Sequence, residues 1–295
     1  IAAHDAGAEV LLLEKMPKSQ AGGNACVCGG SIFCTLGPNE TEYLRALGQG
    51  TAPEDMLGTM AKAMYENFDW FKGLGGELRT KASANDYPSL PGSGDDKVHR
   101  QELVGYLSGA ALMVFLCGKV DKRGIEVMYE TPAKELIQHP RTKEILGVKV
   151  ESEGWDKYIK AKKAVVLTCG GFEYDFEMQK EFVFGHPCRF YANPGNTGDG
   201  IRMAVAVGAA LWHMPLIGGR VIPYIPELGY GLSGGTPTPF ILVTKYGKRW
   251  FKERPWRSHS ACWEAMHWDA DLCDFPASPC FSIFDHSAVV KGAVA

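Results

Sequence analysis

The 295-residue sequence has no uninterrupted apolar run that could cross a membrane. The nearest candidate, residues 105–117, contains glycines and is too short, since a spanning helix needs about 20 apolar residues. The chain also lacks a strong charge of either sign: the net charge is −3, and acidic and basic residues are mixed throughout. No basic stripe or polybasic end is present for nucleic acid or a membrane surface. We therefore expect no membrane span, no nucleic-acid partner and a small-molecule ligand.

Cysteine spacings typical of metal and redox sites are absent too. The nine cysteines form an odd set, and Cys26 and Cys28 are separated by one residue rather than the two of a zinc or redox pair. Several cysteines stand inside apolar segments, which is typical of reduced thiols in a reducing compartment. We expect a cytoplasmic protein without a metal site. A secretion signal lost with an absent N-terminal segment is the alternative.

An apolar run that ends at an acid stands near the start of the chain. Residues Val10–Leu13 predict a strand buried on both faces, and Glu14 follows. In dinucleotide-binding βαβ units, the second strand ends in an acid that bonds a ribose, roughly 20 residues after a glycine-rich turn. That turn is missing, and Ile1–Ala6 has the pattern of the end of the helix after it. We expect the chain to start about one strand and most of a helix into such a unit.

A glycine-dense segment comes after Glu14, with Gly22–Asn24 followed by Gly29–Ser31. Glycines let the backbone pass close to a bulky planar or phosphorylated ligand. A plain surface loop is the alternative, because Gly-Gly pairs are common turn signals. The position directly behind a predicted buried strand favours the ligand site.

The rest of the chain alternates between helical and strand patterns. Helical spacing is predicted for residues 40–73 and for Arg100–Cys117. Strand patterns follow at Gly124–Met128, in an antiparallel ribbon within residues 131–159, and at Ala164–Leu167, which reads as another strand buried on both faces. The length allows two domains, each with its own core.

The most specific segment is Asn196–Met214, NTGDGIRMAVAVGAALWHM. Thr197, Gly198 and Asp199 open a predicted helix that Pro215 ends, and the N-terminal amides of such a helix suit an electron-rich ligand. An ordinary capped helix is the alternative, because Asn, Thr and Asp are all favoured capping residues.

Together, GAEVLLLEK, GGNA, CGGS, TCGG and NTGDGIRM resemble the FAD-binding flavoproteins of the fumarate reductase and succinate dehydrogenase family, which includes urocanate reductases and 3-oxosteroid dehydrogenases. The resemblance implies a Rossmann-like α/β FAD-binding domain with an inserted β ribbon and helices, followed by part of an α+β capping domain. We assign residues 1–214 to the first and 215–295 to the second. It implies non-covalent FAD, held by Glu14, Lys15, Gly23, Asn24, Ala25, Gly29, Gly30, Ser31, Ala133, Thr168, Gly170, Gly171, Thr197, Gly198 and Asp199.

The implied activity is that of a flavin-dependent oxidoreductase acting on CH–CH groups. Such an enzyme moves a hydride between flavin N5 and an activated C=C or CH–CH of a small unsaturated acid or enone. One alternative is a dehydrogenase of 3-oxosteroids or similar cyclic ketones, and another is a catalytically incomplete flavin-binding subunit or fragment. Besides the small-molecule substrate, an electron donor or acceptor protein is an open partner.

Three residues after Met214 are candidates for catalysis. Arg220 stands where fumarate reductases carry a substrate histidine, and it could bind a carboxylate in a bidentate manner. Tyr224 and Tyr230 could supply a proton and polarise a carbonyl, as tyrosines do in the steroid dehydrogenases of the family. Positions on an exposed or packed lid are the alternative for all three. Arg249 and Glu253, beside a predicted hairpin turn at residues 246–248, are expected to form a structural pair or surface charges.

Overall fold

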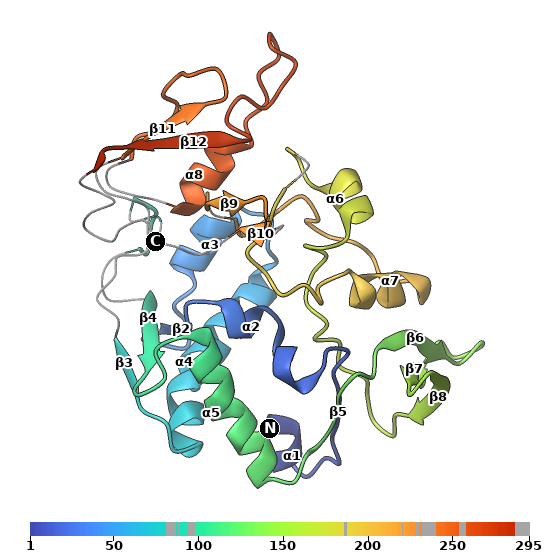
Figure 1. The fold of residues 1–295 in the computed structure, drawn as a ribbon. Coiled ribbons are helices and arrows are strands. Elements are labelled where there is room, and N and C mark those ends of the chain that lie inside the picture. The colour runs from blue at the N-terminus through green and yellow to red at the C-terminus, as the bar shows by residue number, and fades with distance from the viewer. Residues whose placement is uncertain are drawn as a thin grey trace. The chain divides into compact units, whose positions relative to one another are not determined.

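A computed structural model of the chain describes residues 1–80, 87, 89–93, 98–185, 188–219, 221–227, 230–231, 240–253 and 258–286 (Figure 1). The chain forms two compact units, Ile1–Pro132 and Ala133–Ala295. No helix in these described ranges is long and apolar enough to cross a membrane.

The first unit begins with a helix and a strand that belongs to a short parallel sheet. Helix α1 (Ala2–Asp5) precedes strand β1 (Leu11–Leu13), which pairs in parallel with β5 (Glu126–Met128). The predicted strand is confirmed, but its burial on both faces is wrong, because Leu12 is exposed. Among the described residues β5 alone pairs with β1, so one edge of β1 has no neighbouring strand.

An antiparallel sheet and its helices make up the rest of this unit. The sheet has the order β2 (Ser31–Thr35), β4 (Val98–Leu103), β3 (Leu78–Thr80). The helices are the single turn η1 (Lys18–Gln20), α2 (Gly23–Val27), α3 (Glu42–Gly48), α4 (Glu54–Gly73) and α5 (Gly109–Lys122). Helix α4 lies against β2, where the Thr35 hydroxyl donates to the Ala61 carbonyl at 2.9 Å (Figure 1).

The predicted helix over Arg100–Cys117 is wrong in its first part. Residues up to Leu103 belong to β4, and the helix begins only at Gly109. Gln101 and Leu103 are buried while Glu102 between them is less buried, which is the period of two of a strand. The Ser108 hydroxyl accepts the Ala111 N–H and so marks the true start of the helix.

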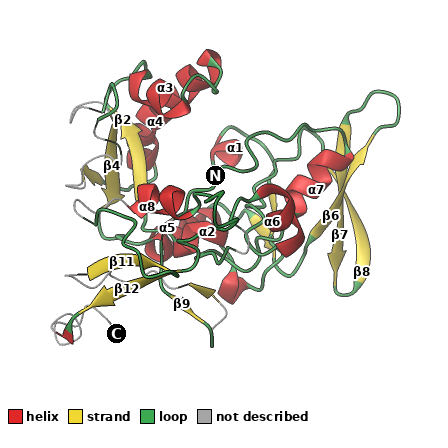
Figure 2. Cartoon of the chain, turned by 90° about the horizontal axis from the view of Figure 1, so that it is seen from above, coloured by secondary structure: helices red, strands yellow, loops and turns green. Residues whose placement is uncertain are grey.

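In the second unit, the predicted ribbon is confirmed. Strands β6 (Ala133–Gln138), β7 (Ile145–Ser152) and β8 (Trp155–Lys160) form an antiparallel sheet in chain order. Helix α6 (Phe176–Phe182) and helix α7 (Asp199–Ala206) follow. Both views place α7 beside the ribbon, where the Gln138 amide donates to the Val207 carbonyl at 3.2 Å (Figures 1 and 2).

Two further strand pairs and a helix complete the description. β9 (Tyr224–Ile225) pairs with β10 (Tyr230–Gly231), and β11 (Phe240–Thr244) pairs with β12 (Cys280–Phe284), both antiparallel. Helix α8 (Ser258–Ala265) lies between β11 and β12 in sequence. The predicted turn at residues 246–248 is confirmed, because the Thr244 N–H donates to the Lys248 carbonyl at 2.8 Å.

Two predictions in this unit are wrong. Residues Ala164–Leu167 form no strand with any described neighbour, and Val166 is 79% exposed. An isolated apolar run without a strand beside it has no partner for its backbone and no layer to bury it. The second concerns α7, which ends at Ala206 and not at Pro215, because Gly208 takes a left-handed φ of 97° and closes the helix.

Candidate cofactor site

In the first unit, Glu14 organises the loop that follows β1. Its carboxylate accepts the Met16 N–H at 2.8 Å and the Gly22 N–H at 3.4 Å, while its carbonyl accepts the Thr131 N–H at 2.9 Å. The acid therefore joins both ends of the loop to the end of the β1–β5 sheet. A carboxylate has about four acceptor positions, so these two bonds leave capacity for a ribose hydroxyl.

The glycines of this unit divide into two kinds. Gly30 has a φ of 70°, and a Cβ there would lie 2.6 Å from the backbone carbon of Ser108, so packing requires glycine. A Cβ at Gly23 or Gly29, in contrast, would meet no atom within 4 Å. Open space beside these two glycines can accommodate a ligand that runs along the backbone. Asn24 and Ala25 lie in α2, Ser31 begins β2, and Lys15 stands in the loop after β1.

In the second unit, the two predicted glycine motifs meet. The Gly198 N–H donates to the Gly171 carbonyl at 3.0 Å, and a Cβ at Gly170 would lie 2.5 Å from Oδ1 of Asn196. No side chain caps α7. The first amides of this eight-residue helix can therefore serve an electron-rich ligand. Thr168 precedes this contact in an exposed irregular segment.

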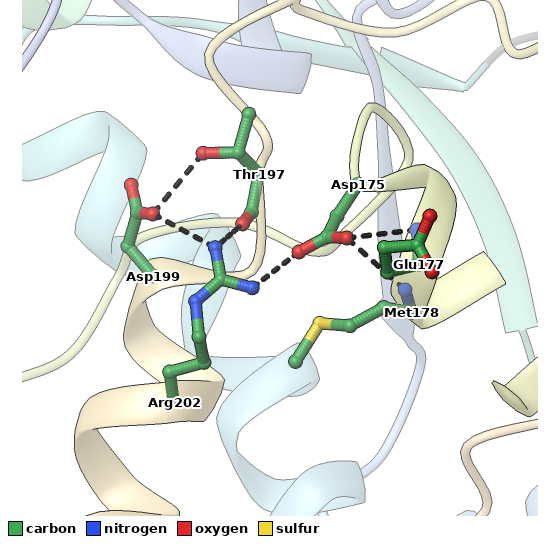
Figure 3. A network of polar contacts seen from close by, with 6 residues as sticks. All are labelled: Asp175, Glu177, Met178, Thr197, Asp199 and Arg202. Atoms are coloured by element: carbon green, nitrogen blue, oxygen red, sulfur yellow. Dashed lines mark hydrogen bonds and ion pairs between the residues drawn. The ribbon is translucent and has the colours of Figure 1, made fainter.

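Arg202 of α7 holds the turn that starts its own helix (Figure 3). Its guanidinium donates to the Thr197 carbonyl and to the Asp175 carboxylate, and it lies 3.5 Å from Asp199. The Thr197 hydroxyl donates to Asp199 at 3.1 Å. Asp175 in turn caps α6 by accepting the N–H groups of Glu177 at 3.1 Å and Met178 at 3.0 Å. One cation thus connects the glycine turn with the start of α6.

The electrostatics of this network keep Asp175 ionised. Partial burial would by itself raise the pKa of Asp175. The Met178 amide and the Arg202 guanidinium outweigh that effect, and the pKa of Asp175 lies below its usual value. The pair therefore persists as an ion pair at neutral pH.

Sequence reasoning missed Asp175 and Arg202. An acid directly before the helical segment FEMQKEF is an N-cap signal that could have identified Asp175. Arg202 stands three residues after Asp199, a spacing that places both on one helix face. The contact between Arg202 and Asp175 joins residues 27 positions apart, and no local pattern predicts it.

The predicted catalytic residues are only partly described. Arg220 lies outside the described residues. Tyr224 is exposed in β9, and the β10 backbone carrying Tyr230 pairs with Ile225, so neighbouring strands hold the two tyrosines. Ala133 opens β6 opposite Val150.

The predicted pair of Arg249 and Glu253 is confirmed as structural. The buried Glu253 carboxylate accepts the Leu242 N–H at 2.8 Å and the Arg249 Nε–H at 3.2 Å. The guanidinium of Arg249 is the main cause that lowers the pKa of Glu253. In the described ranges, no group of three or more His, Cys, Asp or Glu side chains is arranged to hold a metal ion.

Comparison with known proteins gives the same class as the fold and motifs. The family model described as FAD binding domain matches residues 1–271, so the chain belongs to the FAD binding domain family and its cofactor is FAD. The chain is 25% identical to the NADH:fumarate oxidoreductase of Klebsiella pneumoniae, over 100% of the chain and 31% of the relative. It is 26% identical to the digoxin reductase of Eggerthella lenta, over 72% of the chain and 42% of the relative.

The fold matches that of solved flavoenzymes. The 3-ketosteroid delta1-dehydrogenase from Sterolibacterium denitrificans superposes with a TM-score of 0.83 at 20% identity, covering 97% of this chain and 66% of the other. The predicted α/β FAD-binding fold is thereby confirmed. The chain spans less than half the length of the two curated relatives named above.

Each of the two units has features that fit FAD. Open space lies beside Gly23 and Gly29, and the amides at the start of α7 have no side-chain cap. Glu14 keeps acceptor capacity at the end of a parallel strand, which is where such folds bind ligands. The individual FAD contacts of the predicted residues stay predictions.

Proposed function

We propose that the protein is a flavin-dependent oxidoreductase that reduces an activated C=C bond of a small unsaturated acid or enone. FAD supplies hydride transfer between its N5 atom and a substrate carbon. We assign residues 1–214 to cofactor binding and 215–295 to the start of a capping domain that closes over the substrate. An electron donor or acceptor protein completes the reaction, and a reducing compartment suits the free cysteines.

The residues of this chain have distinct tasks in that reaction. Glu14 would bond the ribose of FAD, and the backbone at Gly23 and Gly29 would pass along the cofactor. Arg202 holds the turn at the start of α7 in place, and the backbone amides of that turn would face the flavin. Tyr224 donates a proton from its hydroxyl to the substrate carbon opposite the hydride, and Arg220 orients a carboxylate or carbonyl.

One observation carries the proposal most directly. An uncapped helix starts at the Thr197–Asp199 turn, and that turn is bonded to Gly171 and held by Arg202. Such an arrangement directs backbone N–H groups at a fixed point. In a member of the FAD binding domain family, that point suits the electron-rich edge of the flavin.

A second candidate is a dehydrogenase of cyclic ketones. The exposure of Tyr224 in β9 favours it, because an accessible tyrosine hydroxyl can polarise a carbonyl and move a proton. This candidate predicts turnover of a cyclic ketone with an artificial electron acceptor and no reduction of unsaturated acids.

The test begins with the visible absorption spectrum of the purified protein and of the supernatant after denaturation. Released FAD supports non-covalent cofactor binding. Dithionite-reduced protein is then mixed anaerobically with unsaturated acids and enones. Rapid flavin reoxidation supports the reductase, whereas reoxidation by neither class refutes it. A protein that binds no FAD even when reconstituted refutes the oxidoreductase as a whole.

A further inference from the structure

An exposed arginine in the second unit lies over two exposed aromatic rings. The guanidinium carbon of Arg189 is 5.3 Å from the ring centre of Phe176 and 5.8 Å from that of Tyr224. Phe176 is 48% exposed and Tyr224 is 45% exposed. Within the described part of the chain, no carboxylate pairs with the Arg189 guanidinium. Attraction between an exposed cation and a ring is weak, so this cluster does little for stability and is open to a ligand.

Phe176 connects this cluster to the Thr197–Asp199 turn at the start of α7. It is the first residue of α6 and directly follows Asp175, the N-cap of that helix. The Asp175 carboxylate is paired with Arg202, which holds the Thr197 carbonyl. The backbone that carries Phe176 is therefore held by the same network that holds the Thr197–Asp199 turn.

The backbone after Arg189 is also connected to this turn. The Tyr174 hydroxyl lies 3.3 Å from the carbonyl oxygens of Phe190 and Ala192, to which it donates. The Tyr174 N–H donates to the Asn196 carbonyl at 2.9 Å, one residue before the turn. The backbone that follows Arg189 is consequently connected, through Tyr174, to the segment assigned to the flavin.

The chemistry of this cluster selects a ligand class. A guanidinium over an aromatic ring uses its face, and its in-plane N–H groups remain to bind a carboxylate in a bidentate manner. Exposed rings beside it favour a flat, conjugated group over a saturated chain. We propose that Arg189, Phe176 and Tyr224 form the subsite for the carboxylate and the conjugated plane of the substrate. This inference rests on the proposed function and narrows its substrate to a planar conjugated acid.

The test compares an acid with its neutral ester, trans-cinnamate and methyl cinnamate, by isothermal calorimetry on the FAD-loaded, oxidised protein. Arg189→Ala should raise the dissociation constant of cinnamate by about tenfold to a hundredfold, the equivalent of one charge-assisted hydrogen-bonded contact. The constant for methyl cinnamate should stay unchanged. Arg189→Lys keeps the charge without the fork, so it should lie between wild type and Arg189→Ala. Arg141→Ala, at an exposed turn of the ribbon, is the matched control and should change neither constant.

The remaining outcomes separate the assignment of Arg189 from the proposed function. If Arg189→Ala binds FAD normally and leaves the cinnamate constant unchanged, or weakens acid and ester equally, the assignment of Arg189 is overturned and the reductase proposal stands. The assignment is also overturned if wild-type holoprotein binds neither ligand. Failure of wild-type protein to bind FAD refutes the proposed function itself.

Discussion

Replacing either partner of the Asp175–Arg202 pair should separate helix stability from cofactor binding. Asp175 has two tasks, since it caps α6 through two backbone N–H groups and pairs with Arg202. Asn caps a helix about as well as Asp but carries no charge. Asp175→Asn therefore removes only the ion pair, whereas Asp175→Ala removes both the cap and the pair.

The structure sets the expected magnitudes. The Asp175 side chain is 13% exposed and that of Arg202 is 52% exposed, so solvent screens the pair and its loss should cost less than about 1 kcal/mol. Loss of the cap adds about 1 kcal/mol. We expect the free energy of unfolding to fall by about 1–2 kcal/mol in Asp175→Ala and by less than half of that in Asp175→Asn.

Arg202→Ala should act mainly on FAD. It removes the donor to the Thr197 carbonyl and the contact with Asp199, so the turn loses its support while the cap of α6 remains. A hydrogen bond to a charged group contributes roughly 1.5–3 kcal/mol, so the dissociation constant for FAD should rise about tenfold to a hundredfold. Denaturant unfolding of the apoprotein and quenching of FAD fluorescence on titration measure the two effects independently.

Acid pH gives an independent check on the pair. The pKa of Asp175 is lowered in the folded protein. Its stabilisation is therefore complete above the unfolded value of about 4 and is lost as the pH falls through the folded value. Asp175→Asn should flatten that part of the pH profile. The reasoning would be refuted if Asp175→Asn were as destabilising as Asp175→Ala, or if Arg202→Ala bound FAD with wild-type affinity.

Three further predictions concern positions away from this pair. Gly30→Ala should destabilise the protein by at least about 1 kcal/mol in denaturant unfolding, because φ at Gly30 is 70° and packing leaves no room for a Cβ. Gly29→Ala should leave the free energy of unfolding unchanged and weaken FAD binding, because a Cβ there meets open space. Equal losses of stability in the two variants would contradict this. Burial raises the pKa of Cys34 to about 11, so Cys34 should resist iodoacetamide at pH 8 while the exposed Cys273 reacts, as read by mass spectrometry. Glu253→Ala should lower the free energy of unfolding by roughly 1–3 kcal/mol, because a buried backbone N–H loses its acceptor, and an unchanged denaturation midpoint would contradict it.

Sequence patterns correctly predicted the parts of the fold that depend on interactions between residues close together in the sequence. The strands of the β6–β8 ribbon have strand-like sequences that are separated by polar turns. Helix α4 has apolar residues at helical spacing after Pro53 and Glu54. The run Ala164–Leu167 failed for the opposite reason. An apolar run shows that a segment is suited to burial, but whether the segment forms a buried strand depends on a neighbouring strand.

The candidate site shows the same division. Glycines and acids of the site stand in short motifs because a turn needs glycine at positive φ and a strand end can present one acid, so Glu14 and Gly198 could be found in the sequence. Gly30 and Gly170 also stand in motifs, but the structure assigns both to packing within the protein. For these two glycines packing alone explains the residue type, and their FAD contacts stay predictions.

The residues that support the motif have local signals for a cap and a helix face, but no signal for their contact with each other. Arg202 and Asp175 are ordinary charges until the start of α6 meets α7, and their contact then makes the Thr197–Asp199 turn depend on the cap of a different helix. Thermodynamic linkage works in both directions: a ligand that requires the ordered turn also stabilises the elements that order it. FAD bound at the start of α7 should therefore protect the backbone amides of α6, a segment that is not assigned to contact it. This dependence would arise from one guanidinium shared between two helix starts.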